Sequence, residues 1–157
     1  MTHRTITVWF ACFAFAFAIS LVAAPSDLCA LLTPAQASAV LGATVGAGKP
    51  LASTVCEWKE EGKAGAALLR LDITVITPER FARTKSATIG TVTNVSGIGD
   101  DAYYATIKSG QTINTGLSVK KGGTAVVIRV MEIGGKKTVE EYQAKEKAVA
   151  QAILPKL

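Results

Sequence analysis

The spacing of apolar residues along the chain predicts a series of short strands. In residues 66–76, apolar side chains alternate with Arg70, Asp72 and Thr74, which is the pattern of a strand that buries one face. Similar patterns predict strands at residues 54–59, 102–107, 117–120 and 124–132, and residues 91–95 fit a further short strand. Turn residues separate neighbouring runs, so we expect hairpins and an antiparallel sheet.

Helix start signals predict three helices. Thr33 and Thr77 each precede a proline, so a capping side chain stands before a residue suited to the first turn. Thr138, with a glutamate three residues later, predicts the last helix. The expected order is α-β-β-α-β-β-β-α, and residues 45–50 are expected to form a glycine-rich loop. We interpret residues 25–157 as a single α+β domain with helices packed on one face of the sheet.

Residues 1–24 have the layout of a secretory signal peptide. His3 and Arg4 give a polar, positive start, residues 6–22 are nearly all apolar, and two alanines end the segment. An uncleaved anchor is the alternative, because roughly 17 apolar residues approach the length that spans a membrane. We therefore expect export to the periplasm or the extracellular space.

Composition narrows the class of protein. A length of 157 residues fits one domain, and 49% hydrophobic with 18% charged residues exclude a disordered polyelectrolyte. The formal net charge is +5. Cleavage of the leader would remove His3, the only histidine, and with it any Ser–His or Cys–His nucleophilic pair.

Two cysteines remain after the leader, which carries Cys12. In an exported protein the pair Cys29 and Cys56 predicts a disulfide. Two free buried thiols are the alternative. Two thiols without histidine are too few ligands for zinc, so we expect no metal and no cofactor.

Several short motifs occur in an order that resembles a known family. They are residues 29–34, 40–42, 56–58 and 97–102, with the sequences CALLTP, VLG, CEW and GIGDDA. Their order is similar to that in the small exported envelope proteins of bacteria classed as domain of unknown function 3558, many of which are lipoproteins. The resemblance covers residues 29–154 and implies an envelope protein with paired cysteines and an α+β fold. It implies no catalytic residues, and this chain lacks the lipobox of the lipoprotein members.

A glycine- and aspartate-rich segment at residues 97–101 predicts a structural turn. Gly97 and Gly99 allow unusual backbone angles, and Asp100 and Asp101 can accept hydrogen bonds from turn amides. The alternative is a carboxylate dyad or a calcium site, which would need further carboxylates from elsewhere in the fold.

Two kinds of residue are candidates for a contact surface. Tyr103 and Tyr104 point to opposite faces of a strand, so we expect one in the core and the other free for a partner. Lysines beside glycine turns are either solvated or form a basic surface for an anionic envelope polymer, a lipid surface or an acidic partner. These lysines are Lys120, Lys121, Lys136 and Lys137.

Nucleotides and nucleic acids are not expected ligands. Residues 42–50 superficially resemble a phosphate-binding loop, but Ala43 replaces its first glycine and Pro50 its hydroxyl residue. No basic motif with interleaved aromatic residues is present, and an exported protein seldom meets nucleic acid.

The expected function is a non-enzymatic exported module that binds an envelope protein, an anionic polymer or a small ligand. Membrane contact is expected only if the N-terminal segment is retained. One alternative is a hydrolase that uses carboxylates such as Asp72, Asp100 or Asp101. Another is a purely structural envelope protein. Convergence of at least two carboxylates in one pocket would favour the hydrolase.

Overall fold

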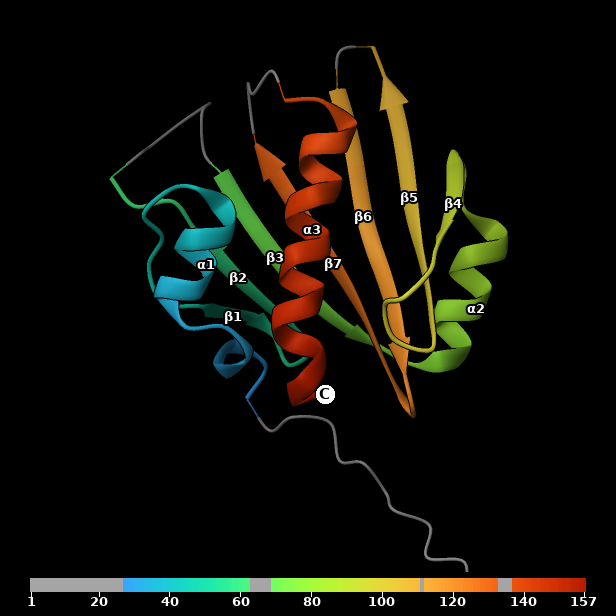
Figure 1. Ribbon diagram of the computed structural model, residues 1–157, viewed down its shortest axis with the longest axis horizontal. Helices are drawn as coiled ribbons and strands as arrows, with labels where there is room; N and C mark the ends of the chain where they lie inside the picture. Colours follow the sequence, from blue (N-terminus) through green and yellow to red (C-terminus); the bar gives the residue numbers. More distant parts are fainter. Residues whose placement is uncertain (1–26, 63–68, 111, 133–136) are drawn as a thin grey trace, which may run out of the picture.

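A computed structural model describes residues 27–62, 69–110, 112–132 and 137–157. They form an antiparallel sheet of seven strands in the order β1-β2-β3-β7-β6-β5-β4 (Figure 1), so the predicted α+β class is confirmed. The strands are β1 (Lys49–Ala52), β2 (Val55–Lys59), β3 (Leu69–Ile76), β4 (Thr91–Val95), β5 (Asp101–Ser109), β6 (Thr112–Lys121) and β7 (Thr124–Glu132). The helices are α1 (Pro34–Leu41), α2 (Pro78–Ala87) and α3 (Val139–Ile153), with 3₁₀ turns η1 (Leu28–Leu31) and η2 (Leu154–Lys156).

Strand β1 begins inside the stretch that was expected to be a loop. Lys49 pairs with Glu57 of β2, which makes β1 one edge of the sheet. Just before it, Gly48 packs so closely on Trp58 that an added Cβ would lie 2.7 Å from ring carbon Cε2. The prediction of a plain loop is therefore wrong at its C-terminal end, because glycine serves here for a close approach of backbone to core.

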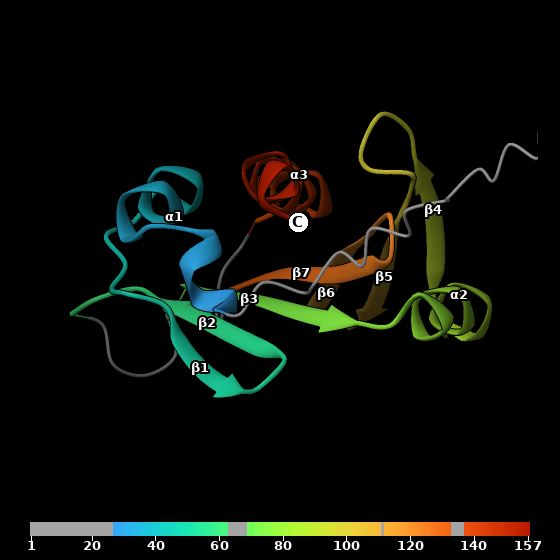
Figure 2. The same ribbon diagram turned by 90° about the horizontal axis from the view of Figure 1, so that it is seen from below.

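Different helices cover the two faces of the sheet (Figure 2). α1 and α3 lie on one face. α2 packs on the other face, where the Phe81 and Tyr103 ring centroids are 5.0 Å apart. Tyr104 points the opposite way and donates a hydrogen bond to the Gln143 carbonyl of α3 at 2.8 Å. The expectation of helices on one face thus holds for α1 and α3 but not for α2, because β5 presents an aromatic side chain to each face.

The main core lies between the sheet and the layer of α1 and α3. Large fully buried side chains in this core include Trp58, Leu71, Ile73, Leu117, Ile128 and Ile153. Each such side chain contributes about 1.5–3 kcal/mol by burial. Lys145 of α3 also donates hydrogen bonds to the Val40 and Leu41 carbonyls at 3.1 and 2.5 Å, so α3 satisfies the last carbonyls of α1.

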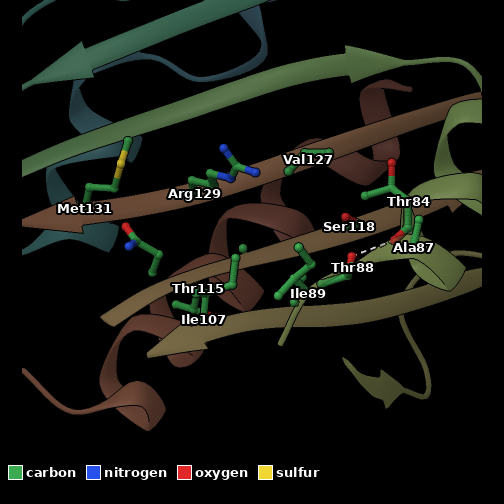
Figure 3. Close-up of a pocket in the computed structure, with 13 residues that line it drawn as sticks. Thr84, Ala87, Thr88, Ile89, Ile107, Thr115, Ser118, Val127, Arg129 and Met131 are labelled. Carbon is green, nitrogen blue, oxygen red and sulfur yellow. Dashed lines mark hydrogen bonds between the residues drawn. The ribbon is translucent and has the colours of Figure 1, made fainter. Parts of the chain in front are cut away.

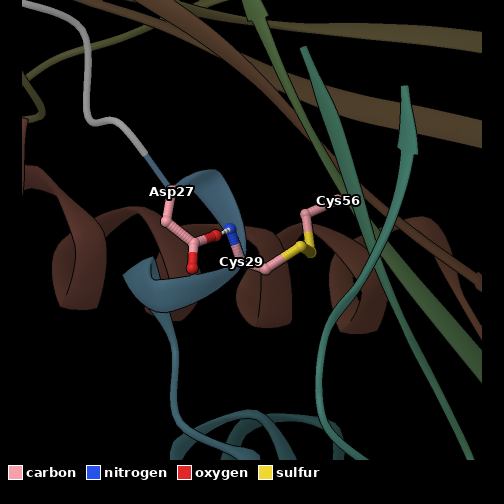
Figure 4. Close-up of a disulfide and its surroundings, with 3 residues drawn as sticks. All are labelled: Asp27, Cys29 and Cys56. Atoms are coloured by element: carbon pink, nitrogen blue, oxygen red, sulfur yellow. Dashed lines mark hydrogen bonds between the residues drawn. A yellow bond between two sulfur atoms is a disulfide. The ribbon is translucent and has the colours of Figure 1, made fainter. Parts of the chain in front are cut away.

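Cys29 and Cys56 form the predicted disulfide (Figure 4). The bond joins η1 to β2 with a Cα–Cα distance of 5.3 Å. The Asp27 carboxylate accepts a hydrogen bond from the Cys29 amide at 2.9 Å and so fixes the start of η1. A loop of this length contributes roughly 3 to 4 kcal/mol by restricting the unfolded chain.

The predicted signal peptide, residues 1–24, lies outside the described residues, as does Lys136. Within the described ranges, no helix has the length and apolar character needed to cross a membrane.

Candidate functional site

A groove of about 530 Å³ lies on the face of the sheet opposite α3 (Figure 3). Its walls are the C-terminal end of α2, the residues after it, and strands β5, β6 and β7. Small-molecule sites usually occupy about 300 to 1,000 Å³, so the groove has the size of a ligand site. Its lining residues are Thr84, Ala87, Thr88, Ile89, Ala105, Ile107, Asn114, Thr115, Gly116, Ser118, Val127, Arg129 and Met131.

The groove follows the line where β6 and β7 separate. β6 pairs with β5 over residues 112–120, but it pairs with β7 only over residues 117–121. At the point of separation the Arg129 side chain lies across Gly116, where an added Cβ would come 3.1 Å from Arg129 Cγ. A side chain at position 116 would therefore displace Arg129 from the groove floor.

A buried carboxyl group closes the gap between these strands from the α3 side. Glu146 is 0% exposed, and its Oε1 accepts a hydrogen bond from the Val130 amide of β7 at 3.2 Å. Its Oε2 has no hydrogen-bond partner within the described residues. Burial raises the pKa of Glu146 to about 8, against smaller opposing effects of the Val130 amide, Arg129 and the Thr115 hydroxyl. The carboxyl is therefore mostly protonated at neutral pH.

Apolar side chains stand exposed in the groove. Ile89, which follows α2, is 86% exposed, and Ile107 of β5 is 44% exposed. In the part of the chain that the structure describes, Leu51 is the one other large hydrophobic side chain that is exposed. Val127 and Met131 add further apolar surface to the same groove. Clustered exposed apolar residues mark ligand or partner sites in soluble proteins.

One positive charge lies among these apolar residues. Arg129 stands on β7 between Val127 and Met131 and lines the groove. Its guanidinium forms no hydrogen bond or ion pair with another described residue, and its field acts on Asp72 and Glu146 at longer range. The five donors of the guanidinium are therefore available to an acceptor on a ligand.

A row of paired charges on β2 and β3 lies beside Arg129. The Arg70 guanidinium is 3.2 Å from Asp72 Oδ2 and 3.7 Å from Glu57 Oε2, and Lys59 Nζ is 3.0 Å from Glu57 Oε1. Asp72 is the register partner of Arg129 on β7. Burial raises the pKa of Asp72, and Arg70 opposes that effect. Because each carboxylate already has a cation, the row leaves Arg129 without a direct partner among the described residues.

The segment at residues 97–101 forms a turn whose members bind other elements. Gly97 and Gly99 have φ values of 75° and 61°, in the left-handed region that favours glycine. Asp100 Oδ2 accepts a hydrogen bond from the Gly122 amide at 2.6 Å. Asp101 Oδ1 accepts one from Lys85 Nζ of α2 at 2.9 Å. The two aspartates therefore have different partners and do not form a dyad.

The tyrosines on β5 are both buried. Tyr103 is 0% exposed and Tyr104 is 8% exposed. The expectation that one of them is free for a contact is wrong, because α2 covers the face of the sheet that carries Tyr103.

Two of the turn lysines have side-chain partners within the chain. Lys121 Nζ donates a hydrogen bond to the Leu154 carbonyl at 2.5 Å, where α3 ends. Lys137 forms an ion pair with Glu132. Lys120 is half-buried and lies opposite Asp101 in the strand register. Lys121 and Lys137 therefore support the fold, and Lys136 lies outside the described residues.

The carboxylates suggested for a hydrolase do not gather in one site, because Asp72, Asp100 and Asp101 each bind a different residue. A second pocket of about 230 Å³ lies beside β1 and β2. Its charged lining residues are Glu57, Glu60, Glu61, Lys49 and Lys59. Carboxylates thus converge there, at residues that the sequence had not singled out.

Two features of the sequence are related to the groove, although neither of them alone predicts it. Arg129 is a single charge within an apolar stretch of the strand predicted at residues 124–132, which indicates a face outside the core. Gly116 interrupts the run before the strand predicted at residues 117–120, and a glycine in a strand often marks a close approach.

The fold and the groove define a class by geometry: an α+β domain that leaves a ligand-sized groove on one sheet face. A scan against protein-family models and searches among curated proteins and solved structures found no match to the chain. The resemblance to the envelope family therefore stays a prediction. No group of three His, Cys, Asp or Glu side chains in the described ranges is arranged to hold a metal ion.

Proposed function

We propose that the mature chain is a non-enzymatic module, exported to the cell envelope, that binds a small ligand in the groove between α2 and strands β5 to β7. The observation that carries this proposal is the pair of exposed side chains, Ile89 and Ile107, within a groove of about 530 Å³. Water around such side chains is unfavourable, and a ligand that covered them would remove that cost. The Cys29–Cys56 bond supports the proposed export, because disulfides persist in oxidising environments outside the cytoplasm.

The chemistry of the lining favours binding over catalysis. Among the described residues that line it, the polar side-chain groups are hydroxyls, one amide and the Arg129 guanidinium, with no His, Cys, Asp, Glu or Lys. General acid–base catalysis needs a group that gains and loses a proton near the working pH. An arginine stays protonated and cannot serve in this way.

A groove-filling variant tests the proposal. Ala87→Trp places a large ring in the lining at the end of α2, and Ala35→Trp on the exposed face of α1 is the matched control. The probe is N-phenyl-1-naphthylamine, an uncharged apolar dye that brightens out of water. We expect saturable binding by the wild type and by Ala35→Trp, and weak or no binding by Ala87→Trp. No saturable binding by the wild type, or equal binding by Ala87→Trp, would contradict the groove as a ligand site.

A carboxylate hydrolase is the second candidate, favoured by the convergence of Glu57, Glu60 and Glu61 in the smaller pocket. Paired carboxyl groups flanking one bond are the usual arrangement in glycoside hydrolysis. Chromogenic glycosides and esters test this function, with Glu61→Gln as the inactivating variant and Glu140→Gln, on the exposed start of α3, as the control. Turnover that is lost only in Glu61→Gln would favour the hydrolase over the binding module.

Export is tested separately. N-terminal sequencing of protein recovered outside the cytoplasm is expected to begin at Ala24 or Pro25, since the small residues end the apolar segment there. An intact chain beginning at Met1 in the membrane fraction would support the retained anchor instead.

A further inference from the structure

We infer that the ligand of the groove is an amphipathic anion, an apolar chain with one carboxylate or phosphate head, whose head binds Arg129. The inference rests on the proposed function, since it names the chemistry of the molecule that the same groove would hold. A carboxylate and a phosphate share this chemistry, as both accept paired hydrogen bonds from a guanidinium.

The charge of the lining selects the head group. Arg129 is the one charged residue among the described residues that line the groove. The nearest acid in the strand register, Asp72, is held by Arg70 at 3.2 Å, and Glu146 lies buried on the far side of the gap between β6 and β7. The groove therefore offers an uncompensated positive charge to its occupant, which favours an anion and disfavours a cation.

The surroundings of Arg129 select the rest of the ligand. Val127 and Met131 flank it on β7, and Ile107 on β5 and Ile89 beside the end of α2 line the same groove (Figure 3). A small inorganic anion would bind Arg129 but leave these side chains in water. A ligand with an apolar chain attached to its anionic head covers both at once.

The contacts of Arg129 favour a role in ligand binding over a role in stabilising the fold. It makes no hydrogen bond or ion pair with another described residue, and its side chain lies over Gly116, which leaves room for it. Removing its charge should therefore alter binding while leaving the fold intact. A melting temperature close to that of the wild type is the check on each variant below.

Displacement of N-phenyl-1-naphthylamine by four probes with the same twelve-carbon chain tests the inference. The probes are dodecanoate, dodecyl phosphate, dodecanol and dodecyltrimethylammonium, each below the concentration at which it aggregates. We expect the dissociation constants of the two anions to be lower than that of dodecanol by about 10-fold or more. The cation should bind most weakly. A preference between dodecanoate and dodecyl phosphate would identify the head group.

Two variants localise the effect to Arg129. Arg129→Gln should weaken the anions by about 10-fold or more and leave dodecanol nearly unchanged, while Arg129→Lys should lie between Arg129→Gln and the wild type. Lys108→Gln removes the same charge from an exposed residue of β5 outside the lining. It should change neither the affinity for the anions nor that for dodecanol.

The possible results separate this inference from the proposed function. Equal binding of dodecanoate and dodecanol, tighter binding of the cation, or full anion affinity in Arg129→Gln would overturn the anionic ligand, although the groove would remain a binding site. Binding of the dye without displacement by any of the four probes would overturn the alkyl chain. Failure of the dye itself to bind the wild type would overturn the groove as a ligand site and the inference with it.

Discussion

Glu146→Gln removes the buried carboxyl between β6 and β7 and keeps its shape. In the folded protein burial raises the pKa of Glu146 to about 8, from an ordinary value of 4.5 that we take for the unfolded chain. Between these values the folded protein holds a proton that the unfolded chain has released. The contribution of Glu146 to the free energy of unfolding is therefore fully present below pH 4.5, and it is lost as the pH rises toward about 8.

The size of the effect follows from the width of the interval. Each pH unit changes the free energy of unfolding by about 1.4 kcal/mol. From 4.5 to about 8 the wild type should lose about 4 to 5 kcal/mol through Glu146 alone. A glutamine cannot ionise, and its carbonyl can still accept the hydrogen bond from the Val130 amide. Wild type and Glu146→Gln should thus have similar stability in acid, and the variant should be more stable at about pH 8 by up to that amount.

Urea unfolding at pH values of about 4.5, 6 and 8, with the disulfide intact, measures this difference. Tyr104, which faces Glu146, does not titrate in this range because burial raises its pKa to about 12. Glu140→Gln is the control on the same helix. A hydrogen bond with its own backbone lowers the pKa of the exposed Glu140 carboxyl. Any contribution of Glu140 to stability therefore has the opposite pH dependence and is lost in acid. Parallel stability curves for wild type and Glu146→Gln would refute a raised pKa at Glu146.

The remaining predictions concern the disulfide and the turn at residues 97–101. The double variant Cys29→Ser, Cys56→Ser should lower the free energy of unfolding by about 2 to 5 kcal/mol in urea titrations. An unchanged midpoint would refute a stabilising role of the disulfide. Gly99→Ala should lower the melting temperature more than Gly97→Ala. Both have positive φ, but only at Gly99 does an added methyl group meet neighbouring atoms, and equal melts would contradict this. Asp100→Ala should cost about 1 kcal/mol in thermal melts, because it removes the acceptor of a turn amide, whereas Asp100→Asn keeps an acceptor; equal losses would exclude that role.

Features set by neighbours in the sequence were predicted well. The capping boxes at Thr33 and Thr138 both form, since their partners stand three residues along the same helix. The alternation at residues 69–75 is that of β3, whose apolar residues there face the main core, whereas Ile76 packs on the opposite face. The disulfide could be predicted because only two cysteines follow the predicted leader.

Features set by distant residues were not predicted. Whether Tyr103 is exposed depends on where α2 lies, and no local pattern gives the face on which a helix packs. The groove depends on the separation of β6 from β7, which is a property of two strand registers and of Glu146 on α3. The sequence alone therefore did not predict that Arg129 of β7 and Ile107 of β5 line the same groove.

The strand order has a consequence for how the chain folds. β1 to β3 and β4 to β7 are two groups of sequence neighbours, and the sheet joins them only through β3 and β7, where Ile76 pairs with Ala125. Hairpins within each group close short loops, whereas the seam between the groups closes a long one and so forms late. The Cys29–Cys56 bond joins η1 to β2 of the first group and reaches no strand of the second group. Oxidation therefore stabilises one half of the sheet without tying it covalently to the other, and the β3–β7 strand pairing and the packing around it hold the two halves together.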